Sequence, residues 1–251
     1  MKRIRTLDNC PPGLENYLNC EDDRAHWQGF RDHNASASYK ELMETLSKFQ
    51  HGLCGYCEIR LTELNRQIEH VIPQSDPQHG PAKSLDITNM IACCKGGSFS
   101  DWSGNEDRYR EPAKKNLSCG QKKDNSMNAN FVDPRELPAL PSLMRVSPNG
   151  EIRVNANACS SAGIVPERVT DTIEVLGLNV ERLRWAREKR WKALKNSWNS
   201  HWDDLDLMNA AARVELLPDG ENDLLKFFTT TRSYFGPLAE RVLKQQPQEW
   251  I

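Results

Sequence analysis

The residues best suited to chemistry lie in the stretch CGYCEIRLTELNRQIEHVIPQS, which runs from Cys54 to Ser75. Glu69 and His70 are adjacent there and are followed by two apolar residues and Pro73. An imidazole can take a proton from water, and a carboxylate suits the hard cations Mg²⁺ and Mn²⁺. Phosphodiester hydrolysis needs such a base, together with a divalent cation that neutralises charge on the phosphate and the leaving oxygen. Glu69 and His70 are therefore the first candidates for a catalytic pair.

The cysteines of the same region have the spacing of a metal site. Cys54 and Cys57 can supply two thiolates from one tight turn, and Cys94 and Cys119 complete the simplest tetrahedral set, with Cys93 pointing elsewhere. The alternative is that these residues are small buried hydrophobic side chains. The surrounding segment is polar and rich in turn formers, so apolar burial would not order it, whereas bound zinc can contribute about 10 to 16 kcal/mol in small sites. We expect a structural Zn²⁺ ion.

The elements that must position these residues change in character along the chain. The pattern predicts a helix over residues 36–52, with a serine cap and Gly52 as its stop, and a hairpin over residues 143–155 around Pro-Asn-Gly. A long amphipathic helix is expected within residues 166–205 and a final helix over residues 224–243. The fold class is α+β, with an N-terminal helical region (1–50), a zinc-stapled core (51–130) and a mainly helical C-terminal region (131–251).

The expected long helix has two contrasting faces. Its apolar stripe, interpreted as core rather than as a stacking platform, consists of Val180, Leu183, Trp191, Leu194, Trp198 and Trp202. Its basic face, which we expect to meet a nucleic acid or a protein partner, consists of Arg184, Arg187, Lys189 and Lys195. Charge reversal at Arg184, Arg187 and Lys189 would separate these two partners.

Composition restricts the classes of function. With 38% hydrophobic and 27% charged residues and no apolar run long enough to cross a bilayer, the chain is expected to be cytoplasmic, with no membrane partner. Its start, MKRIRTLDNCPPG, lacks the apolar segment of a secretory signal. The net charge is −2, so any nucleic-acid surface must be local. Two windows, residues 108–123 and 182–195, have six and seven basic residues against one acid each, although either could be only a solvated face.

Asn89, nineteen residues after His70, and the segment CGQKKDN complete a pattern that resembles the HNH nucleases of the ββα-metal type. More closely, the chain resembles the HNH endonucleases of bacterial antiphage systems, namely the Septu nuclease component (PtuB-like), which is also found as a retron-associated effector. The motifs behind this resemblance are MKRI with its Pro-Pro, GLCGYCE, IEHVIP, NMIACC, SCGQKKDN and TIEVLGLNVERLRWAR. It implies a ββα-metal core flanked by helical regions, in which His70 is the general base, Asn89 fixes the imidazole by a hydrogen bond and Glu69 binds Mg²⁺ or Mn²⁺.

One position departs from the HNH pattern. Many HNH proteins have a metal-binding His or Asn directly after the last zinc cysteine, where this chain has Gly120. We expect Asp124 to supply the missing ligand, with Asn125 and Gln121 as alternatives. The basic residues expected to contact phosphates of the nucleic acid are Lys114, Lys115, Lys122 and Lys123.

The function implied is a metal-dependent endonuclease that acts as an effector of antiphage defence. DNA is the expected substrate and RNA or tRNA the alternative, and backbone contacts are expected to dominate binding. The resemblance implies an ATPase partner (PtuA-like) and, for retron relatives, a reverse transcriptase with its msDNA. This chain has no G-x-x-x-x-G-K-[ST] motif, so ATP hydrolysis would belong to the partner. The competing hypothesis is a non-catalytic zinc-stapled binding module. A zinc deaminase is disfavoured because His-x-Glu and Pro-Cys-x-x-Cys are absent.

Overall fold

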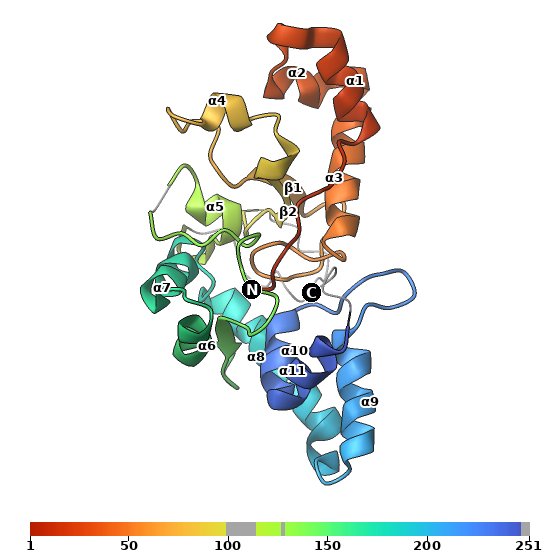
Figure 1. Cartoon of the computed structure of the whole chain (residues 1–251), viewed down its shortest axis with the longest axis vertical. Coiled ribbons are helices and arrows are strands. Elements are labelled where there is room, and N and C mark those ends of the chain that lie inside the picture. Colours follow the sequence, from red (N-terminus) through yellow and green to blue (C-terminus); the bar gives the residue numbers. More distant parts are fainter. Residues whose placement is uncertain (99–113, 127–128, 247–251) are drawn as a thin grey trace.

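The computed structural model describes residues 1–98, 114–126 and 129–246, which form a mixed structure of many helices and two small β-sheets (Figure 1). The α-helices are α1 (Pro12–Glu21), α2 (Trp27–Asp32), α3 (Ala37–Phe49), α4 (Gly80–Lys83), α5 (Cys119–Lys123), α6 (Ala156–Ser161), α7 (Pro166–Val175), α8 (Glu181–Trp198), α9 (Leu205–Leu216), α10 (Phe228–Phe235) and α11 (Pro237–Lys244). Short 3₁₀ turns are η1 (Asp22–Arg24), η2 (His33–Ser36), η3 (Ile87–Asn89), η5 (Lys114–Asn116) and η6 (Asn199–His201).

The first sheet is the antiparallel pair β1 (Arg66–His70) and β2 (Met90–Cys94). In its register Arg66 pairs with Cys94 and His70 pairs with Met90. Every residue of β2 is buried, whereas only the central Ile68 of β1 is buried. Helix α3 packs on both strands and α5 packs on β2. The sheet therefore presents β1, and not β2, to the exterior.

Helix α3 lies within the predicted segment. Leu42, Met43 and Leu46 are buried along one face, and the helix ends three residues before Gly52, which has φ 72°. The expected serine cap is wrong. Ser36 adopts φ 66° and makes no capping hydrogen bond through its side chain, because η2 enters the helix through a left-handed turn.

The predicted hairpin around Pro-Asn-Gly is confirmed as β3 (Met144–Val146) and β4 (Ile152–Val154), which pair antiparallel. Gly150 has φ 76°, and a Cβ at this position would lie 1.8 Å from the Arg184 carbonyl oxygen. Only glycine fits, because the turn both requires a positive φ and lies directly against the backbone of α8.

The long helix predicted within residues 166–205 is two helices, α7 and α8. Gly177 has φ 57°, and the Leu178 N–H returns to the Ile173 carbonyl, which ends α7 in a left-handed turn. Of the predicted stripe, Leu183 and Leu194 are buried, while Trp202 lies beyond the helix and remains 39% exposed. All residues of the predicted stripe lie after the break at Gly177, so the stripe belongs to α8 and the residues that flank it and not to α7.

The predicted basic face of this region is also only partly exposed. Arg184 and Lys195 are exposed, but Arg187 is buried and donates to the Gly150 carbonyl oxygen at 2.8 Å and to the Leu178 carbonyl. Arg187 therefore fastens α8 to the β3–β4 turn and is not available to a partner.

The predicted final helix is likewise divided. Residues 228–235 form α10 and residues 237–244 form α11, separated by Gly236 with φ 53° and followed by Pro237, which starts α11. Proline cannot continue a preceding helix but fits the first turn of the next one.

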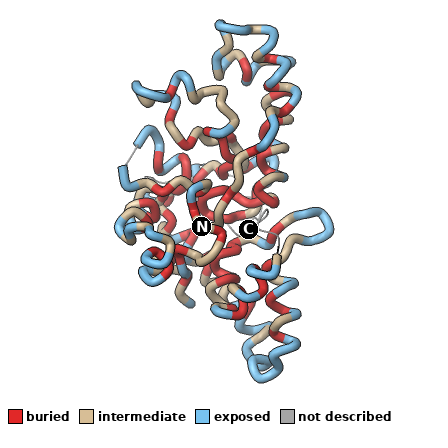
Figure 2. Tube along the Cα trace, in the orientation of Figure 1, coloured by how far each residue is buried: buried red, intermediate tan, exposed pale blue. Residues whose placement is uncertain are grey.

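The buried hydrophobic residues of the described part of the chain fall into two clusters. Figure 2 marks the buried residues in red along the Cα trace. The larger cluster joins the N-terminal helices, the β1–β2 sheet, the cysteines and α7. The smaller cluster joins the end of α8 with α9, α10 and α11. Among the described residues, no helix combines the length and the apolarity required to cross a bilayer.

Candidate active site

Four cysteine side chains converge beneath the β1–β2 sheet. The thiols of Cys54, Cys57, Cys94 and Cys119 are buried, and their sulfur atoms all lie within 4.8 Å of one another. The Cys57–Cys94 and Cys94–Cys119 Sγ separations are both 3.7 Å, and the Cys54–Cys119 separation is 4.0 Å. A tetrahedron with Zn–S bonds of about 2.3 Å has edges of about 3.8 Å. The four residues predicted from sequence thus have the spacing that Zn²⁺ requires.

Local backbone structure brings these thiols together. Cys54 and Cys57 lie in a tight loop, Cys94 ends β2, and Cys119 starts α5 with φ 56°. The Cys94 N–H donates to the Cys54 sulfur at 3.3 Å, as is common where a thiolate accepts backbone donors. Hydrogen bonding with Cys119 lowers the pKa of the Cys94 thiol to about 5. Cys93, the predicted bystander, donates to the Cys94 carbonyl oxygen at 3.3 Å and lies outside the set of four.

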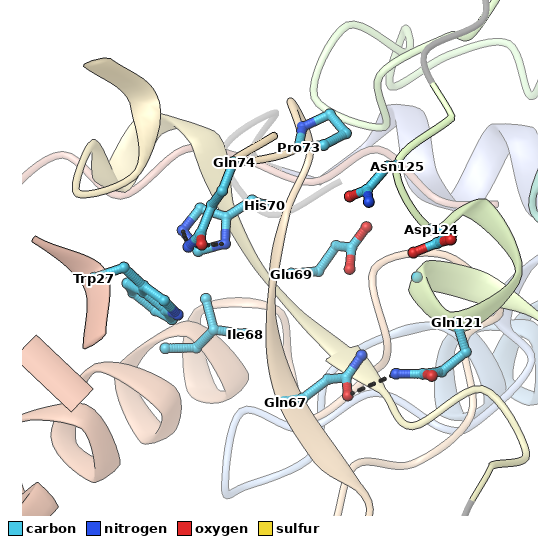
Figure 3. A pocket seen from close by; sticks show the side chains of 11 residues that line it. Trp27, Gln67, Ile68, Glu69, His70, Pro73, Gln74, Gln121, Asp124 and Asn125 are labelled. Atoms are coloured by element: carbon cyan, nitrogen blue, oxygen red, sulfur yellow. Dashed lines mark hydrogen bonds between the residues drawn. The ribbon is translucent and has the colours of Figure 1, made fainter. Parts of the chain in front are cut away.

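A cavity of about 290 Å³ lies at the exposed edge of β1 (Figure 3). Its wall contains Glu69 and His70 from the strand and Gln121, Asp124 and Asn125 from α5 and the residues that follow it. Side chains alternate along a strand. In Figure 3 His70 lies on one side of β1 with Trp27 and Gln74, whereas Glu69 lies on the other side facing Asp124. The predicted pair therefore lines one cavity from opposite faces of the strand.

The imidazole of His70 is held on its own side of β1 by three neighbours. Its Nε2 lies 2.8 Å from the Ser84 carbonyl oxygen, which can only accept, so Nε2 carries the proton and Nδ1 is the free base. The Trp27 ring meets the imidazole edge-on, with centroids 4.4 Å apart and planes at 85°. The Gln74 amide nitrogen is 3.3 Å from both ring nitrogens.

The environment of His70 favours its neutral form. Burial lowers the pKa of the imidazole below its ordinary value, the Ser84 carbonyl opposes this shift, and the positive charge of Lys123 adds to it. A neutral imidazole with an unprotonated Nδ1 is the form that a general base requires.

Asn89 does not contact the imidazole, which corrects the expected hydrogen bond between them. Its side chain accepts from the Ile72 N–H at 2.8 Å and donates to the carbonyl oxygens of Ile72 at 3.0 Å and Lys83 at 3.1 Å. Asn89 is 2% exposed and is aimed at the backbone because it precedes β2 inside the closing loop. It ties the exit of β1 to the segment that carries Ser84, and so it acts on His70 through the backbone.

Glu69 is paired with a buried cation. The Lys123 Nζ lies 3.1 Å from Glu69 Oε1 and 3.4 Å from the His70 carbonyl oxygen, and the Lys123 side chain is 1% exposed. The Tyr56 hydroxyl lies 3.5 Å from the same carboxylate oxygen. Burial raises the pKa of Glu69, and the nearby Lys123 opposes that shift. Lys123 was expected to contact phosphate. Its burial contradicts that expectation, because its ammonium already contacts Glu69 and the His70 carbonyl oxygen on β1.

Gly120 explains how the carboxylate fits against α5. A Cβ at this position would lie 2.1 Å from Glu69 Oε2, so any larger residue would displace the carboxylate. Asp124 ends α5 with φ 48° and is exposed in the cavity wall, next to Asn125. Gln121 instead donates to Gln67 at 3.3 Å. In the part of the chain that the structure describes, the four cysteines are the one group of three or more His, Cys, Asp or Glu side chains close enough together to hold an ion. Glu69, His70 and Asp124 do not form such a group.

The remaining predicted phosphate contacts are placed only in part. Lys115 and Lys122 are exposed, whereas the side chain of Lys114 and residues 108–113 lie outside the described residues.

Several contacts of the site had no signal in the sequence. Ser84 acts through its carbonyl, which every residue has, and Trp27 is separated from His70 by 43 positions. Tyr56 lies inside the Cys-x-x-Cys loop, so its proximity to Cys54 and Cys57 was evident but its contact with Glu69 was not.

Comparison with known proteins gave two relatives. The chain is 30% identical over 228 residues to a protein of Escherichia coli assigned as the HNH endonuclease of retron Ec83, an alignment that covers 82% of this chain and 83% of that protein. It is 26% identical over 187 residues to the corresponding protein of retron Vc95 from Vibrio cholerae serotype O1 biovar El Tor, covering 74% and 81%. No family model matches the chain.

Proposed function

The chain belongs to the family of HNH endonucleases that includes those assigned to retrons Ec83 and Vc95, and from this premise we propose that it hydrolyses phosphodiester bonds of nucleic acid at the cavity beside β1. The proposal rests on one observation above the others. A neutral, backbone-anchored His70 and an acidic residue, Glu69, line the same cavity at the end of one strand.

His70 is the general base of this proposal. With Nε2–H donated to the Ser84 carbonyl, Nδ1 can accept a proton from a water molecule placed in the cavity. Trp27 and Gln74 restrict rotation of the ring, and Asn89 holds the loop that carries the Ser84 carbonyl. A base held in one orientation loses less entropy on reaching the transition state.

Glu69 and Asp124 would hold a Mg²⁺ or Mn²⁺ ion, with Asn125 or Gln121 as a further oxygen donor. The donor set fits, because hard divalent ions prefer carboxylate and amide oxygens. When bound, such an ion neutralises charge on the scissile phosphate and on the leaving oxygen. Lys123 keeps Glu69 Oε1 engaged and leaves Oε2 toward Gly120 and the cavity. In this proposal β1, β2 and α5 are the ββα-metal unit, and the four cysteines bind the structural Zn²⁺ that fastens α5 to the sheet.

We propose DNA as the substrate, with RNA or tRNA as the alternative. The biological role proposed is antiphage defence of the Septu (PtuB-like) or retron type, in the cytoplasm, with an ATPase (PtuA-like) that licenses cutting and, in a retron setting, a reverse transcriptase with its msDNA. The names of the two relatives support the retron setting. The Septu assignment and the ATPase partner rest on the motif resemblance alone.

The test uses the purified chain, alone and with the proposed ATPase partner, incubated with plasmid DNA and with total tRNA in Mg²⁺ or Mn²⁺. We expect the wild-type protein to degrade one pool and His70→Ala to degrade neither, with equal zinc content in both proteins. If wild-type protein cuts nothing in any combination while it retains zinc and binds nucleic acid, the non-catalytic binding module becomes the better description.

A further inference from the structure

A second cavity, of about 660 Å³, lies between η2, α3 and the turn before β1. Its wall includes Arg31, Tyr39, Lys40 and Arg66, together with the apolar side chains of Met43 and Leu64. Leu64 is 58% exposed and gives this wall an apolar surface that a ligand could cover. A volume of this order is typical of sites for small organic ligands.

One wall residue of this cavity, Arg66, belongs to β1, the strand that carries His70. Arg66, Ile68 and His70 share one face of the strand because side chains alternate, and Arg66 and His70 are about 13 Å apart along it. A second link runs through aromatic contacts. Trp27 meets His70 edge-on and also meets Tyr39 edge-on, with centroids 5.9 Å apart. The Arg31 guanidinium lies over the Tyr39 ring at 5.6 Å.

The charges of the cavity are balanced, which excludes a simple anion trap. Three cations are accompanied by Asp32, Glu44 and Glu63. Glu44 is paired with Lys48 at 2.8 Å, and Asp32 accepts from Gln28 at 2.9 Å. Arg66 and Lys40 can therefore meet a phosphate, while Glu63 can accept a hydrogen bond from an exocyclic amine. A nucleotide presents a phosphate, such amines and an aromatic face that stacks on a guanidinium plane.

The backbone beside the cavity is strained. Asn34, Ala35 and Ser36 have φ values of 50°, 50° and 66° in succession, and none of them is glycine. Each such residue costs on the order of 1 to 3 kcal/mol, and strain of this kind concentrates at functional sites. Here the left-handed turn brings Ser36 into the cavity wall and directs the first turn of α3, which carries Tyr39 and Lys40.

We propose that this cavity, the nucleotide pocket, binds one unpaired nucleotide of the substrate next to the scissile bond. The inference rests on the proposed function, since it assumes that nucleic acid is cut at His70. It adds that the enzyme prefers a strand with an extruded or single-stranded nucleotide, because a base stacked inside a duplex could not enter the pocket.

The test compares two substrates that share the reaction but differ in length. Bis(4-nitrophenyl) phosphate has no nucleotide for the pocket, whereas a single-stranded oligonucleotide fills it. We expect the double variant Lys40→Gln/Arg66→Gln to raise KM for the oligonucleotide roughly tenfold and to hydrolyse the small ester at the wild-type rate. The matched control is Arg24→Gln, which changes an exposed cation on η1 that does not line the pocket.

Binding supplies a readout that is independent of cleavage. The binding experiment uses fluorescence anisotropy in a His70→Ala background. The protein that keeps Lys40 and Arg66 should bind the single strand more tightly than the duplex. The protein that also has Lys40→Gln/Arg66→Gln should lose affinity for the single strand. Equal oligonucleotide kinetics in the double variant and the control would overturn the pocket, as would an equal fall for both substrates. Binding of free adenosine monophosphate as tight as that of the oligonucleotide would also overturn the assignment, in favour of an effector site.

Failure of the proposed function gives a different result. In that case wild-type protein hydrolyses neither the ester nor the oligonucleotide, while the anisotropy comparison still decides whether residues 40 and 66 bind a nucleotide.

Discussion

The Lys123 ammonium lies 3.1 Å from Glu69 Oε1, inside the protein, with a side-chain exposure of 1%. It also reaches the His70 carbonyl oxygen at 3.4 Å, so one cation from α5 contacts both members of the proposed catalytic pair on β1. Glu69 itself is 12% exposed, which makes this a largely desolvated pair with one carboxylate oxygen facing the cavity.

Replacing Lys123 should remove the ion pair that holds Glu69 in place. We expect Lys123→Met to lower the free energy of unfolding by about 3 kcal/mol, because loss of one partner leaves a buried charge uncompensated. Cleavage should fall as Glu69 loses its orientation. Urea denaturation and cleavage rates measure the two effects. Lys122→Met is the matched control, since Lys122 is the exposed neighbour. Equal stability and activity of the two variants would show that the pair does not position Glu69.

Cleavage should persist to lower pH than an ordinary histidine would allow. Burial and Lys123 lower the pKa of His70, and the neutral imidazole is the active form. The rate should therefore hold as the pH falls below about 6.5 and decline only through the lower pKa of the folded enzyme. The contribution of His70 to folding stability has the same pH dependence. It is fully present above the pKa of His70 in the unfolded chain, and it is lost as the pH falls through the lower pKa of His70 in the folded protein. In Lys123→Met the fall in cleavage rate on the acidic side of the pH profile should move to higher pH, because the pKa of His70 rises when the nearby positive charge is removed. If this fall does not move, a group other than His70 causes it.

Adjacent cysteines should behave differently. Cys94→Ser should abolish zinc binding and unfold the region around β1 and β2, because the ion contributes directly to folding. Cys93→Ser, one residue earlier, should retain one zinc per chain, since Cys93 lies outside the ligand set. Elemental analysis and circular dichroism distinguish the two. Zinc loss in both variants would mean that Cys93 also serves as a ligand.

Asn89 should affect activity without touching the imidazole. Asn89→Ala leaves the Ile72 N–H and two carbonyl groups without their partner, which should cost roughly 3 kcal/mol of stability and loosen the loop that carries Ser84. Asn89→Asp keeps the acceptor for Ile72 and should lose less stability. Urea midpoints and the pH profile of cleavage give the comparison. An Asn89→Ala protein of unchanged stability would contradict the anchoring role.

The two arginines of α8 provide a fifth test. Arg187→Glu should destabilise the protein by several kcal/mol, about 3 or more, because it introduces an acid where two carbonyl oxygens accept hydrogen bonds. Arg184→Glu should leave stability unchanged, since Arg184 is exposed. Thermal unfolding measures both. Arg184, and not Arg187, is thus the residue whose charge reversal can report on a partner or on nucleic acid.

The four-cysteine cluster could be predicted from sequence because thiolate ligands are few and a Cys-x-x-Cys turn has little alternative use. The chain contains eight cysteines, and the four that converge include the Cys54–Cys57 pair, the one pair with Cys-x-x-Cys spacing. The β3–β4 hairpin was predictable for a similar reason, since Pro-Asn-Gly specifies a local backbone conformation.

Helix breaks and side-chain partners were less predictable. Gly177 and Gly236 end helices because tertiary packing stabilises their left-handed conformation. A single glycine in a helical pattern does not by itself predict such a break, since helices tolerate isolated glycines. The sequence also showed Lys122 and Lys123 as equivalent charges. They differ because α5 turns one toward β1 and the other toward solvent, and a single residue of rotation on so short a helix decides which one is buried.

Cys119, the last of the four clustered cysteines, is held by residues that lie far downstream. The Cys119 N–H donates to the Leu176 carbonyl oxygen at 2.7 Å, and the Arg182 guanidinium contacts the Asn116 carbonyl oxygen and the neighbouring Ser118 hydroxyl. At about 5 to 20 residues per second, a ribosome needs roughly 3 to 11 s to synthesise the chain from Cys119 to Leu176. During synthesis all four cysteines are therefore present before Leu176 and Arg182 have been added to the chain. A nascent chain in this interval has the whole HNH motif but lacks the contacts from Leu176 and Arg182 that hold Cys119 and the turn before it.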